Sequence, residues 1–384
     1  KPDLIDFISY PYEWSFSQIK DAALTTLKIQ KTALDHGMIL KDASAYNIQF
    51  KKGSPIFIDT LSFEIYEEGM PWFAYRQFCQ HFLAPLALIS YKDARFNNML
   101  KNFLDGIPLD LASSILPVRT KFNLSLLMHI HFHAKQQVKY SDKQINTKNL
   151  KMSKKSLLAL IENLETTINK LTWHPKGTEW GDYYNFTNYT DDAFNYKKSL
   201  VEKFLAKTDT KILWDLGANI GVFSRIASKK GIKTIAFDID PVAVEKNYLL
   251  SKENKETMIL PLIMDLTNPS PALGWNNEER DSFAQRGNPD TIFALALIHH
   301  LAISNNIPLV YLARLFSGLT KNLIIEFVPK SDSQVQKLLS TRKDIFHDYN
   351  LESFEKVFAA YFRIVEKAKI ECTERTLYLM ERLG

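Results

Sequence analysis

Cysteine and long apolar runs are scarce in this sequence of 384 residues. Its only two cysteines, Cys79 and Cys372, lie far apart, which excludes a zinc-ligand spacing or a disulfide framework and is typical of a reducing compartment. We therefore expect a cytoplasmic location. No apolar run is long enough to cross a bilayer, so no membrane span is expected. Because the sequence opens with Lys1 rather than Met, we expect the natural N-terminus to lie further upstream.

A large excess of one charge is also missing. The formal net charge is +5, with 24% charged and 46% hydrophobic residues. So mild an excess gives no reason to expect a nucleic-acid partner. The length is typical of two globular domains, each with its own core, and leaves the oligomeric state open.

The most informative stretch runs from Lys211 to Asp240. It predicts a strand over 212–216, a glycine-bearing turn over 217–221, a helix, and a second strand over 234–237 that is closed by an acid. Glycine lets the backbone bend sharply and approach a ligand, and the helix that follows offers unpaired N–H groups. This is the outline of a nucleotide-binding unit, with an acid placed for ribose hydroxyls.

The G-x-G-x-x-G fingerprint is absent, which favours a nucleoside without phosphates. The run from Asp215 through Gly217 to Gly221 resembles the acid-x-Gly-x-x-x-Gly motif of the class I S-adenosylmethionine (SAM) methyltransferases. Over about residues 180 to 384, this resemblance implies an α/β fold with a Rossmann-like seven-stranded sheet and SAM as the cofactor. Further strands are expected at 258–264, 291–296 and 323–327, with 364–370 and 376–380 as a closing antiparallel pair.

Ligands of such sheets lie at the carboxyl ends of the strands. There we expect Asp238 to bind the ribose and Asp265 the adenine amino group. From the polar and aromatic segment 173–197 we select Tyr189 and Lys197 as part of a lid over the cofactor. The same segment also fits an aromatic loop packed on the sheet edge. The full predicted cofactor site is Asp215, Gly217, Ala218, Asn219, Gly221, Asp238, Ile239, Asp265, Leu266, Leu295, Tyr189 and Lys197.

The predicted catalytic residues are His299, His300 and Glu326. A neutral imidazole beside the methyl donor can remove a proton from an attacking hydroxyl, although the histidine pair could equally cap the fourth strand. Glu326 and Asp332 are the rival bases. No metal site is expected, because the H-I-H-F-H run over 129–133 has no acidic or thiol partner nearby.

Residues 1–150 are predicted to form a mostly helical N-terminal domain, followed by the methyltransferase domain over 151–384. The spacing of Asp42, Asn47 and Asp59 resembles the catalytic loop and metal-binding Asp of kinase C-terminal lobes. Thr60 replaces the glycine that follows this Asp in kinases, and no glycine-rich ATP loop precedes the motif. Polar turn residues around a hairpin explain the same pattern.

The block LKDASAYNIQF…FIDTLSFE upstream of ALALIHHLAI resembles the NoeA-related methyltransferases that are associated with nodulation-type glycolipid modification. This resemblance implies a carbohydrate or another hydroxylated small molecule as the methyl acceptor. Two alternatives stay open: a fragment of a bifunctional kinase-methyltransferase, and a non-catalytic SAM-binding module.

Overall fold

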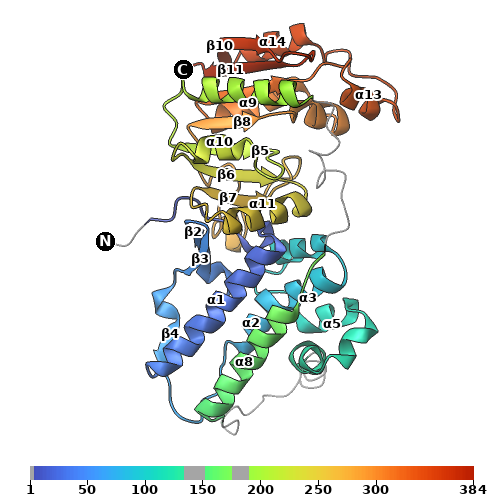
Figure 1. Ribbon diagram of the computed structural model, residues 1–384. Coiled ribbons are helices and arrows are strands. Elements are labelled where there is room, and N and C mark those ends of the chain that lie inside the picture. The colour runs from blue at the N-terminus through green and yellow to red at the C-terminus, as the bar shows by residue number, and fades with distance from the viewer. Residues whose placement is uncertain (1–3, 134–151, 175–189) are drawn as a thin grey trace. The chain divides into compact units, whose positions relative to one another are not determined.

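The computed structural model describes residues 4–133, 152–174 and 190–384, which form two compact units, Lys1–Lys176 and Gly177–Gly384 (Figure 1). The boundary predicted near residue 150 is too early. Helix α8 (Lys154–Lys170), an amphipathic segment that we expected to pack on the sheet of the methyltransferase domain, belongs to the first unit, where it packs on helix α1 (Phe16–Asp35). The apolar face of α8 fits a helix as well as it fits a sheet, so its sequence pattern did not reveal its partner.

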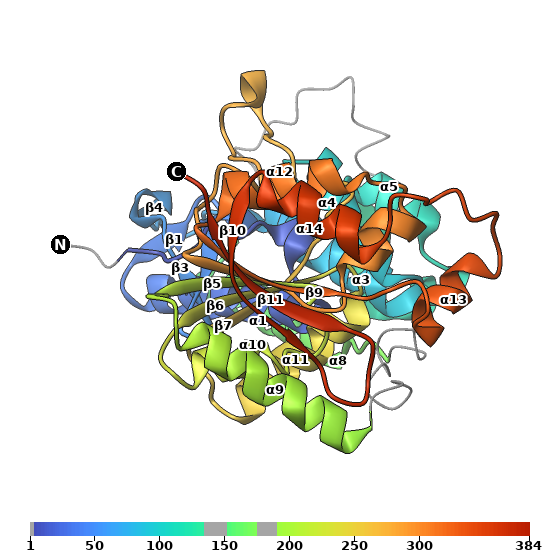
Figure 2. The ribbon, with the colours of Figure 1, turned by 90° about the horizontal axis from the view of Figure 1, so that it is seen from above.

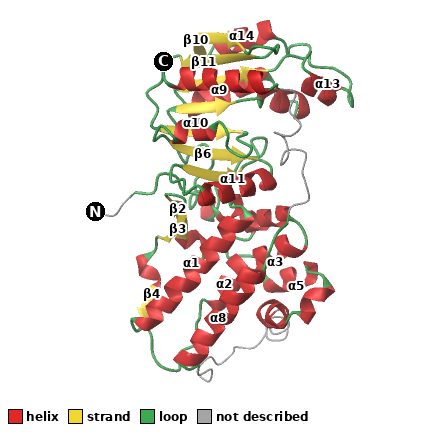
Figure 3. Cartoon of the chain, viewed as in Figure 1, coloured by secondary structure: helices red, strands yellow, loops and turns green. Residues whose placement is uncertain are grey.

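The first unit is mostly helical and has two small antiparallel strand pairs (Figure 3). Strand β1 (Met38–Leu40) pairs with β4 (Phe63–Ile65), and β2 (Ile48–Lys51) forms the predicted hairpin with β3 (Ser54–Phe57). Its other described helices are α2 (Tyr75–Phe78), α3 (Ala84–Tyr91), α4 (Met99–Asn102), α5 (Leu109–Ile115) and α6 (Leu124–Leu126), with π-helical turns at Cys79–Leu83 and Leu127–Phe132.

The second unit contains the predicted seven-stranded sheet, in the order β10-β11-β9-β8-β5-β6-β7. The five strands β9, β8, β5, β6 and β7 pair in parallel. Strand β11 is antiparallel to both of its neighbours, β9 and β10, and forms the predicted closing pair with β10. The strands are β5 (Ile212–Leu216), β6 (Lys233–Asp238), β7 (Ile259–Ile263), β8 (Thr291–Ala294), β9 (Asn322–Phe327), β10 (Phe362–Lys369) and β11 (Thr376–Arg382).

Helices cover both faces of this sheet (Figure 2). On one face lie α9 (Asp191–Leu205), α10 (Ser224–Ser228) and α11 (Pro241–Glu253); on the other lie α12 (Leu309–Leu319) and α14 (Leu351–Ala359). The central strands β8 and β9 are buried along their whole length and mostly apolar, as is typical of parallel sheets that are covered on both faces. A further helix, α13 (Ser333–Leu339), follows β9.

In the part of the chain that the structure describes, no helix combines the length and the apolar character that crossing a bilayer requires.

Candidate functional site

The turn after β5 holds two glycines in the left-handed region, Gly217 at φ +76° and Gly221 at φ +79°. A Cβ atom on Gly217 would lie 3.2 Å from Leu297, and one on Gly221 would lie 2.6 Å from the side chain of Asn247. A side chain at Gly221 would therefore clash, and one at Gly217 would be strained by its positive φ and crowded by Leu297, but only Gly217 faces the cavity described below. Gly221 makes room for packing against α11.

The end of β6 is tied to this turn through Asp238. Its Oδ2 accepts the N–H of Asn219 at 2.8 Å, and its Oδ1 accepts the N–H of Asp240 at 2.9 Å. The N–H of Gly217 donates to the carbonyl of Phe237 at 2.9 Å. These hydrogen bonds fix the orientation of the Asp238 carboxyl group before any ligand binds.

A cavity of about 370 Å³ lies at the carboxyl ends of β5, β6, β7 and β8. Because β5, β6 and β7 are neighbours, Asp215, Asp238 and Asp265 lie along one edge of the sheet on successive strands, which are about 4.8 Å apart. Most of the predicted site residues line this cavity: Lys197, Asp215, Gly217, Ala218, Asn219, Asp238, Ile239, Asp265, Leu266, Leu295 and His300.

Two of these acids hold their protons unusually tightly. Burial raises the pKa of Asp215 to about 7, with a further contribution from the nearby Asp238 charge, although Ser224 donates a 2.6 Å hydrogen bond to its carboxylate. Burial also raises the pKa of Asp238 to about 6 against the lowering effect of its backbone hydrogen bonds. Both carboxyl groups therefore favour a ligand that donates hydrogen bonds or carries positive charge.

Three predicted site residues do not line the cavity, and a fourth lies outside the described residues. Gly221 packs against α11, whereas His299 and Glu326 are buried beside the cavity, 2% and 0% exposed. The strand that carries Glu326 is buried along its whole length, and the carboxylate forms ion pairs with Lys197 and Arg375. Glu326 is therefore not available as a base. Tyr189 lies in the segment that the structure does not describe, together with most of the predicted lid.

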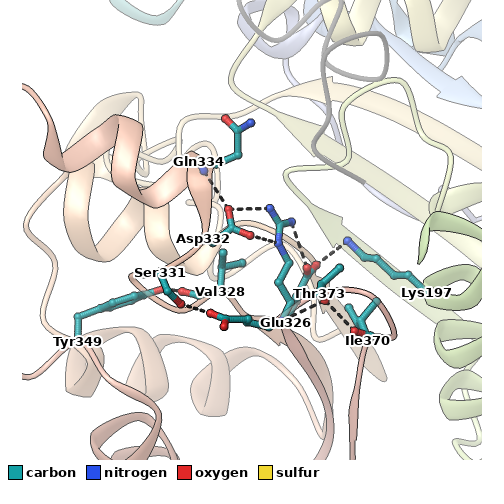
Figure 4. Close-up of polar contacts among 11 residues, drawn as sticks. Lys197, Glu326, Val328, Ser331, Asp332, Gln334, Tyr349, Ile370 and Thr373 are labelled. Carbon is teal, nitrogen blue, oxygen red and sulfur yellow. Dashed lines mark hydrogen bonds and ion pairs between the residues drawn. The ribbon is translucent and has the colours of Figure 1, made fainter. Parts of the chain in front are cut away.

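The ion-pair network is a buried chain of alternating charges (Figure 4). The Nζ atom of Lys197 lies 2.5 Å from Oε2 of Glu326, whose Oε1 lies 3.4 Å from Nη1 of Arg375. Arg375 also binds Asp332 in a bidentate manner, at 2.7 and 3.0 Å. Asp332, the other rival base, caps α13 by accepting the N–H of Gln334. Neither acid is therefore free for proton transfer.

The two histidines differ in their surroundings. Their rings lie 4.0 Å apart, but only His300 lines the cavity. Burial, with the neighbouring His300 as a smaller cause, holds the pKa of His299 well below its usual range, so His299 is neutral. The Nδ1 atom of His299 has no hydrogen-bond partner in the described structure. His300 is consequently the predicted base whose position fits proton transfer.

Several cavity residues were missed by the sequence analysis, including Phe194, Phe223, Leu301, Ser304 and Leu338. Phe194 stands three positions before Lys197 on α9, and this helical spacing would have placed both on one face. Leu301 and Ser304 belong to a π-helical turn at His300–Ser304, and Leu338 belongs to α13. No local signal connects these elements to the glycine turn.

In the first unit, two residues of the kinase-like motif meet at a common partner. Asn47 donates to the hydroxyl of Ser62 at 3.2 Å, and that hydroxyl donates to Asp59 at 2.5 Å. Asp42 instead accepts the N–H of Ser44 at 2.9 Å within its own loop. The side chains of Asn47 and Asp59 are therefore both hydrogen-bonded to Ser62, an arrangement that fits the kinase-like motif and the turn of a hairpin equally.

The histidines of the H-I-H-F-H run have separate partners. His129 contacts Tyr75 at 2.6 Å and Asn163 at 2.7 Å, while His131 contacts Ser113 at 2.8 Å and Thr120 at 2.9 Å. Among the described residues, no group of three or more histidines, cysteines or acids is arranged to hold a metal ion.

The sheet order and the cavity at its carboxyl edge define an α/β protein of the methyltransferase-like class. The chain is 38% identical over 385 residues to nodulation protein NoeA of Rhizobium meliloti (strain 1021). This alignment covers 99% of this chain and 81% of that protein. The chain therefore belongs to the NoeA family, in agreement with the sequence resemblance. No family model matches it.

Three solved structures of methyltransferases are similar to part of the chain. Magnesium protoporphyrin IX methyltransferase of Synechocystis PCC 6803 aligns with a TM-score of 0.37 and 16% identity, over 53% of this chain and 93% of its own. N-methyltransferase NodS of Bradyrhizobium japonicum WM9 aligns with a TM-score of 0.37 and 10% identity, over 50% of this chain and 98% of its own. The bifunctional kinase-methyltransferase WbdD aligns with a TM-score of 0.32 and 17% identity, over 50% of this chain and 38% of its own.

Proposed function

We propose that the second unit binds SAM and transfers its methyl group to a hydroxyl of a small-molecule or carbohydrate acceptor. The observation that supports this proposal is the row of acids at the ends of three neighbouring strands, Asp265, Asp238 and Asp215, along one cavity. A nucleoside that extends into an amino acid offers hydrogen-bond donors at matching intervals. No phosphate-type loop is needed for such a ligand.

The residues fit this ligand from one end of the cavity to the other. Asp265 and Leu266 follow β7 and are placed for the adenine ring, with the carboxylate accepting from its amino group. Asp238, held rigid by backbone N–H groups, is placed to accept from both ribose hydroxyls. The methionine part then lies against Gly217 and Asp215, where the missing Cβ of Gly217 leaves room.

When bound, SAM supplies a methyl group activated by its sulfonium, and the transfer is an in-line displacement. The protein must chiefly hold the two reactants in contact and exclude water. The walls that exclude water are Leu295, Leu297 and Leu301, near the end of β8. His300 lies on the same side and would remove the proton of the acceptor hydroxyl.

The acceptor class rests on the family resemblance and on the position of His300. A hydroxyl must lose its proton to a base when its oxygen attacks, whereas a neutral amine has less need of a base. Testing a panel of carbohydrate and lipid-linked carbohydrate acceptors with isotope-labelled methyl donor would identify the acceptor. If no carbohydrate acceptor becomes labelled and an amine compound does, a hydroxyl acceptor is excluded.

The test of the central proposal is calorimetry of the whole chain with SAM and with its demethylated product, S-adenosylhomocysteine (SAH). We expect the wild type to bind both and Asp238→Ala to abolish binding, while Asp209→Ala, an exposed control upstream of β5, changes nothing. The proposal fails if the wild type binds neither compound. Detectable methyl transfer would exclude the alternative of a non-catalytic SAM-binding module.

A second candidate function concerns the first unit. The meeting of Asn47 and Asp59 at Ser62 favours a magnesium-dependent nucleotide site of the kinase type. We expect magnesium-dependent ATP binding that Asp59→Ala removes and Asp35→Ala, an exposed acid at the end of α1, leaves intact. Absence of ATP binding in the wild type would make this loop purely structural.

A further inference from the structure

An exposed apolar strip lies on the surface of the first unit. Its side chains are 47% to 86% exposed and belong to Val118, Phe122, Leu124, Met128 and Phe132. Phe122 is the most exposed large apolar side chain among the residues that the structure describes. Single apolar residues scattered over a surface need no explanation, but five within 15 residues mark an interaction surface.

The local structure places the members of this strip close together. The 3-10 helix Val118–Phe122 packs against the helical stretch 124–132, which α6 and the π-helical turn after it form together. Within this stretch every fourth residue belongs to the strip, so these members share one face. Leu126 and Ile130 lie on the opposite face and are fully buried. The stretch therefore has an apolar outer face in addition to its buried inner face.

Basic side chains accompany the strip. Arg119 and Lys121 are exposed between its first two members, and the sequence from 111 to 141 contains no aspartate or glutamate. Helix α8 packs on α6, and its acids Glu162 and Glu165 lie 3.8 and 3.6 Å from a lysine of α1, which partly offsets their charge. The immediate surroundings of the strip thus favour an anionic partner.

The positive charge of the whole chain is concentrated in this part of the sequence. Residues 111–161 contain nine of its 48 lysines and arginines but only one of its 43 aspartates and glutamates. The remaining residues therefore carry 39 basic and 42 acidic side chains, an excess of three acids. The net charge of +5 thus combines a basic segment with a slightly acidic remainder, and such asymmetry is typical of chains that bind an anionic surface.

We propose that the apolar strip inserts into the surface of a membrane that contains anionic lipids, while Arg119 and Lys121 contact the lipid headgroups. Apolar and aromatic side chains beside basic ones favour the boundary between headgroups and acyl chains. The helical stretch 124–132 is too short to span a bilayer, so it lies on the membrane and does not cross it. This inference is independent of the methyl transfer proposed above.

Two other partners fit the strip less well. A second copy of the chain would bring two basic surroundings together, because a symmetric dimer uses the same patch on both subunits. A single-stranded nucleic acid would stack its bases on aromatic rings, but three of the five side chains in the strip are not aromatic. An anionic membrane matches both the apolar and the basic side chains.

The test is cosedimentation of the whole chain with vesicles of phosphatidylcholine alone or of phosphatidylcholine mixed with phosphatidylglycerol. One variant combines Phe122→Gln with Phe132→Gln, and its control is Leu61→Gln, an 80% exposed residue of the first unit outside the strip. A second variant is Lys121→Gln, with Lys28→Gln on the exposed side of α1 as its control. Circular dichroism checks that each variant is folded.

We expect the wild type to bind the mixed vesicles at least about tenfold more tightly than phosphatidylcholine alone, because two basic side chains lie near the anionic surface. The double variant should weaken binding to the mixed vesicles by about tenfold or more, because it removes two aromatic anchors. Lys121→Gln should weaken it about fivefold. Both controls should change it by less than about twofold.

A wild type that does not bind the mixed vesicles would overturn the inference, and this measurement needs no variant. Binding that the double variant leaves unchanged would place the contact elsewhere and overturn it as well. So would a wild type that binds an RNA oligonucleotide, or dimerises through the strip, without binding vesicles. A wild type that binds the mixed vesicles with the expected variant effects but does not bind SAM would support the inference and refute only the proposed function.

Discussion

Replacing Asp215 by Asn should make the ligand-free protein more stable and, at the same time, a poorer binder of SAM. The side chain is buried, and its pKa rises from an ordinary 3.8 to about 7. Asn keeps the size and can still accept the hydrogen bond from Ser224, but it has no charge to bury. The variant therefore removes an electrostatic cost and leaves the packing unchanged.

The size and the sign of the effect follow from linkage. Below pH 3.8 the carboxyl is protonated in both the folded and the unfolded chain, so its raised pKa costs nothing there. As the pH rises, the unfolded chain ionises first, and folding loses stability until the folded carboxyl ionises near pH 7. The gap between 3.8 and about 7 corresponds to about 4 kcal/mol at pH 8, and to less than about 2 kcal/mol at pH 5.

Native-state hydrogen exchange of the β5 and β6 amides is the suitable assay, because it reports on the second unit alone, whereas a global unfolding curve mixes both units. The exposed Asp209→Asn is the matched control. Equal or lower protection of Asp215→Asn at pH 8, or a gain that does not grow from pH 5 to pH 8, would refute the reasoning.

Four further predictions follow from the site and the sheet. SAM affinity should rise from pH 5 to pH 8 in calorimetry, because Asp215 and Asp238 bind the ligand in their ionised forms. Gly221→Ala should lower the free energy of unfolding of the second unit by several kcal/mol, because its Cβ would clash. Arg375→Met should cost about 3–5 kcal/mol in the same measurement, because it leaves buried carboxylates without their cation. His300→Gln should keep SAH affinity within about threefold and reduce methyl transfer about 100-fold or more.

Controls and contrary results are available for each of these. Gly231→Ala has the same positive φ with open space around it, so it should cost only about 1 kcal/mol; equal losses at both glycines would contradict the clash. A pH-independent SAM affinity would mean that neither acid titrates in this range. An Arg375→Met variant of wild-type stability, or a His300→Gln variant of full activity, would remove the roles assigned to those side chains.

The sequence predicted the sheet and the acid row well, because both depend on local patterns. β5 was predicted with the observed bounds, and β6 within one residue at each end, since short apolar runs closed by glycine and aspartate have few alternatives. Parallel strands then bring their carboxyl ends to one edge, so Asp215, Asp238 and Asp265 meet without further information.

The incorrect predictions concern the directions in which side chains point and contacts between distant residues. His299 and His300 are adjacent, and which of the two faces the cavity depends on the rotation of a π-helical turn. Glu326 ends up between Lys197 and Arg375, 129 residues before it and 49 residues after it, so its role as an ion-pair partner has no local signal. Similarly, the apolar face of α8 does not reveal that its partner is α1.

Strand β11 lies inside the sheet, between β9 and β10, although it follows both in sequence. Arg375 stands in the turn between β10 and β11, so its guanidinium reaches Glu326 and Asp332 only after this hairpin has docked on β9. Without the docked hairpin, these carboxylates would lack their shared cation. The edge of the sheet and the ion-pair network that holds Lys197 at the cavity wall therefore depend on each other for stability.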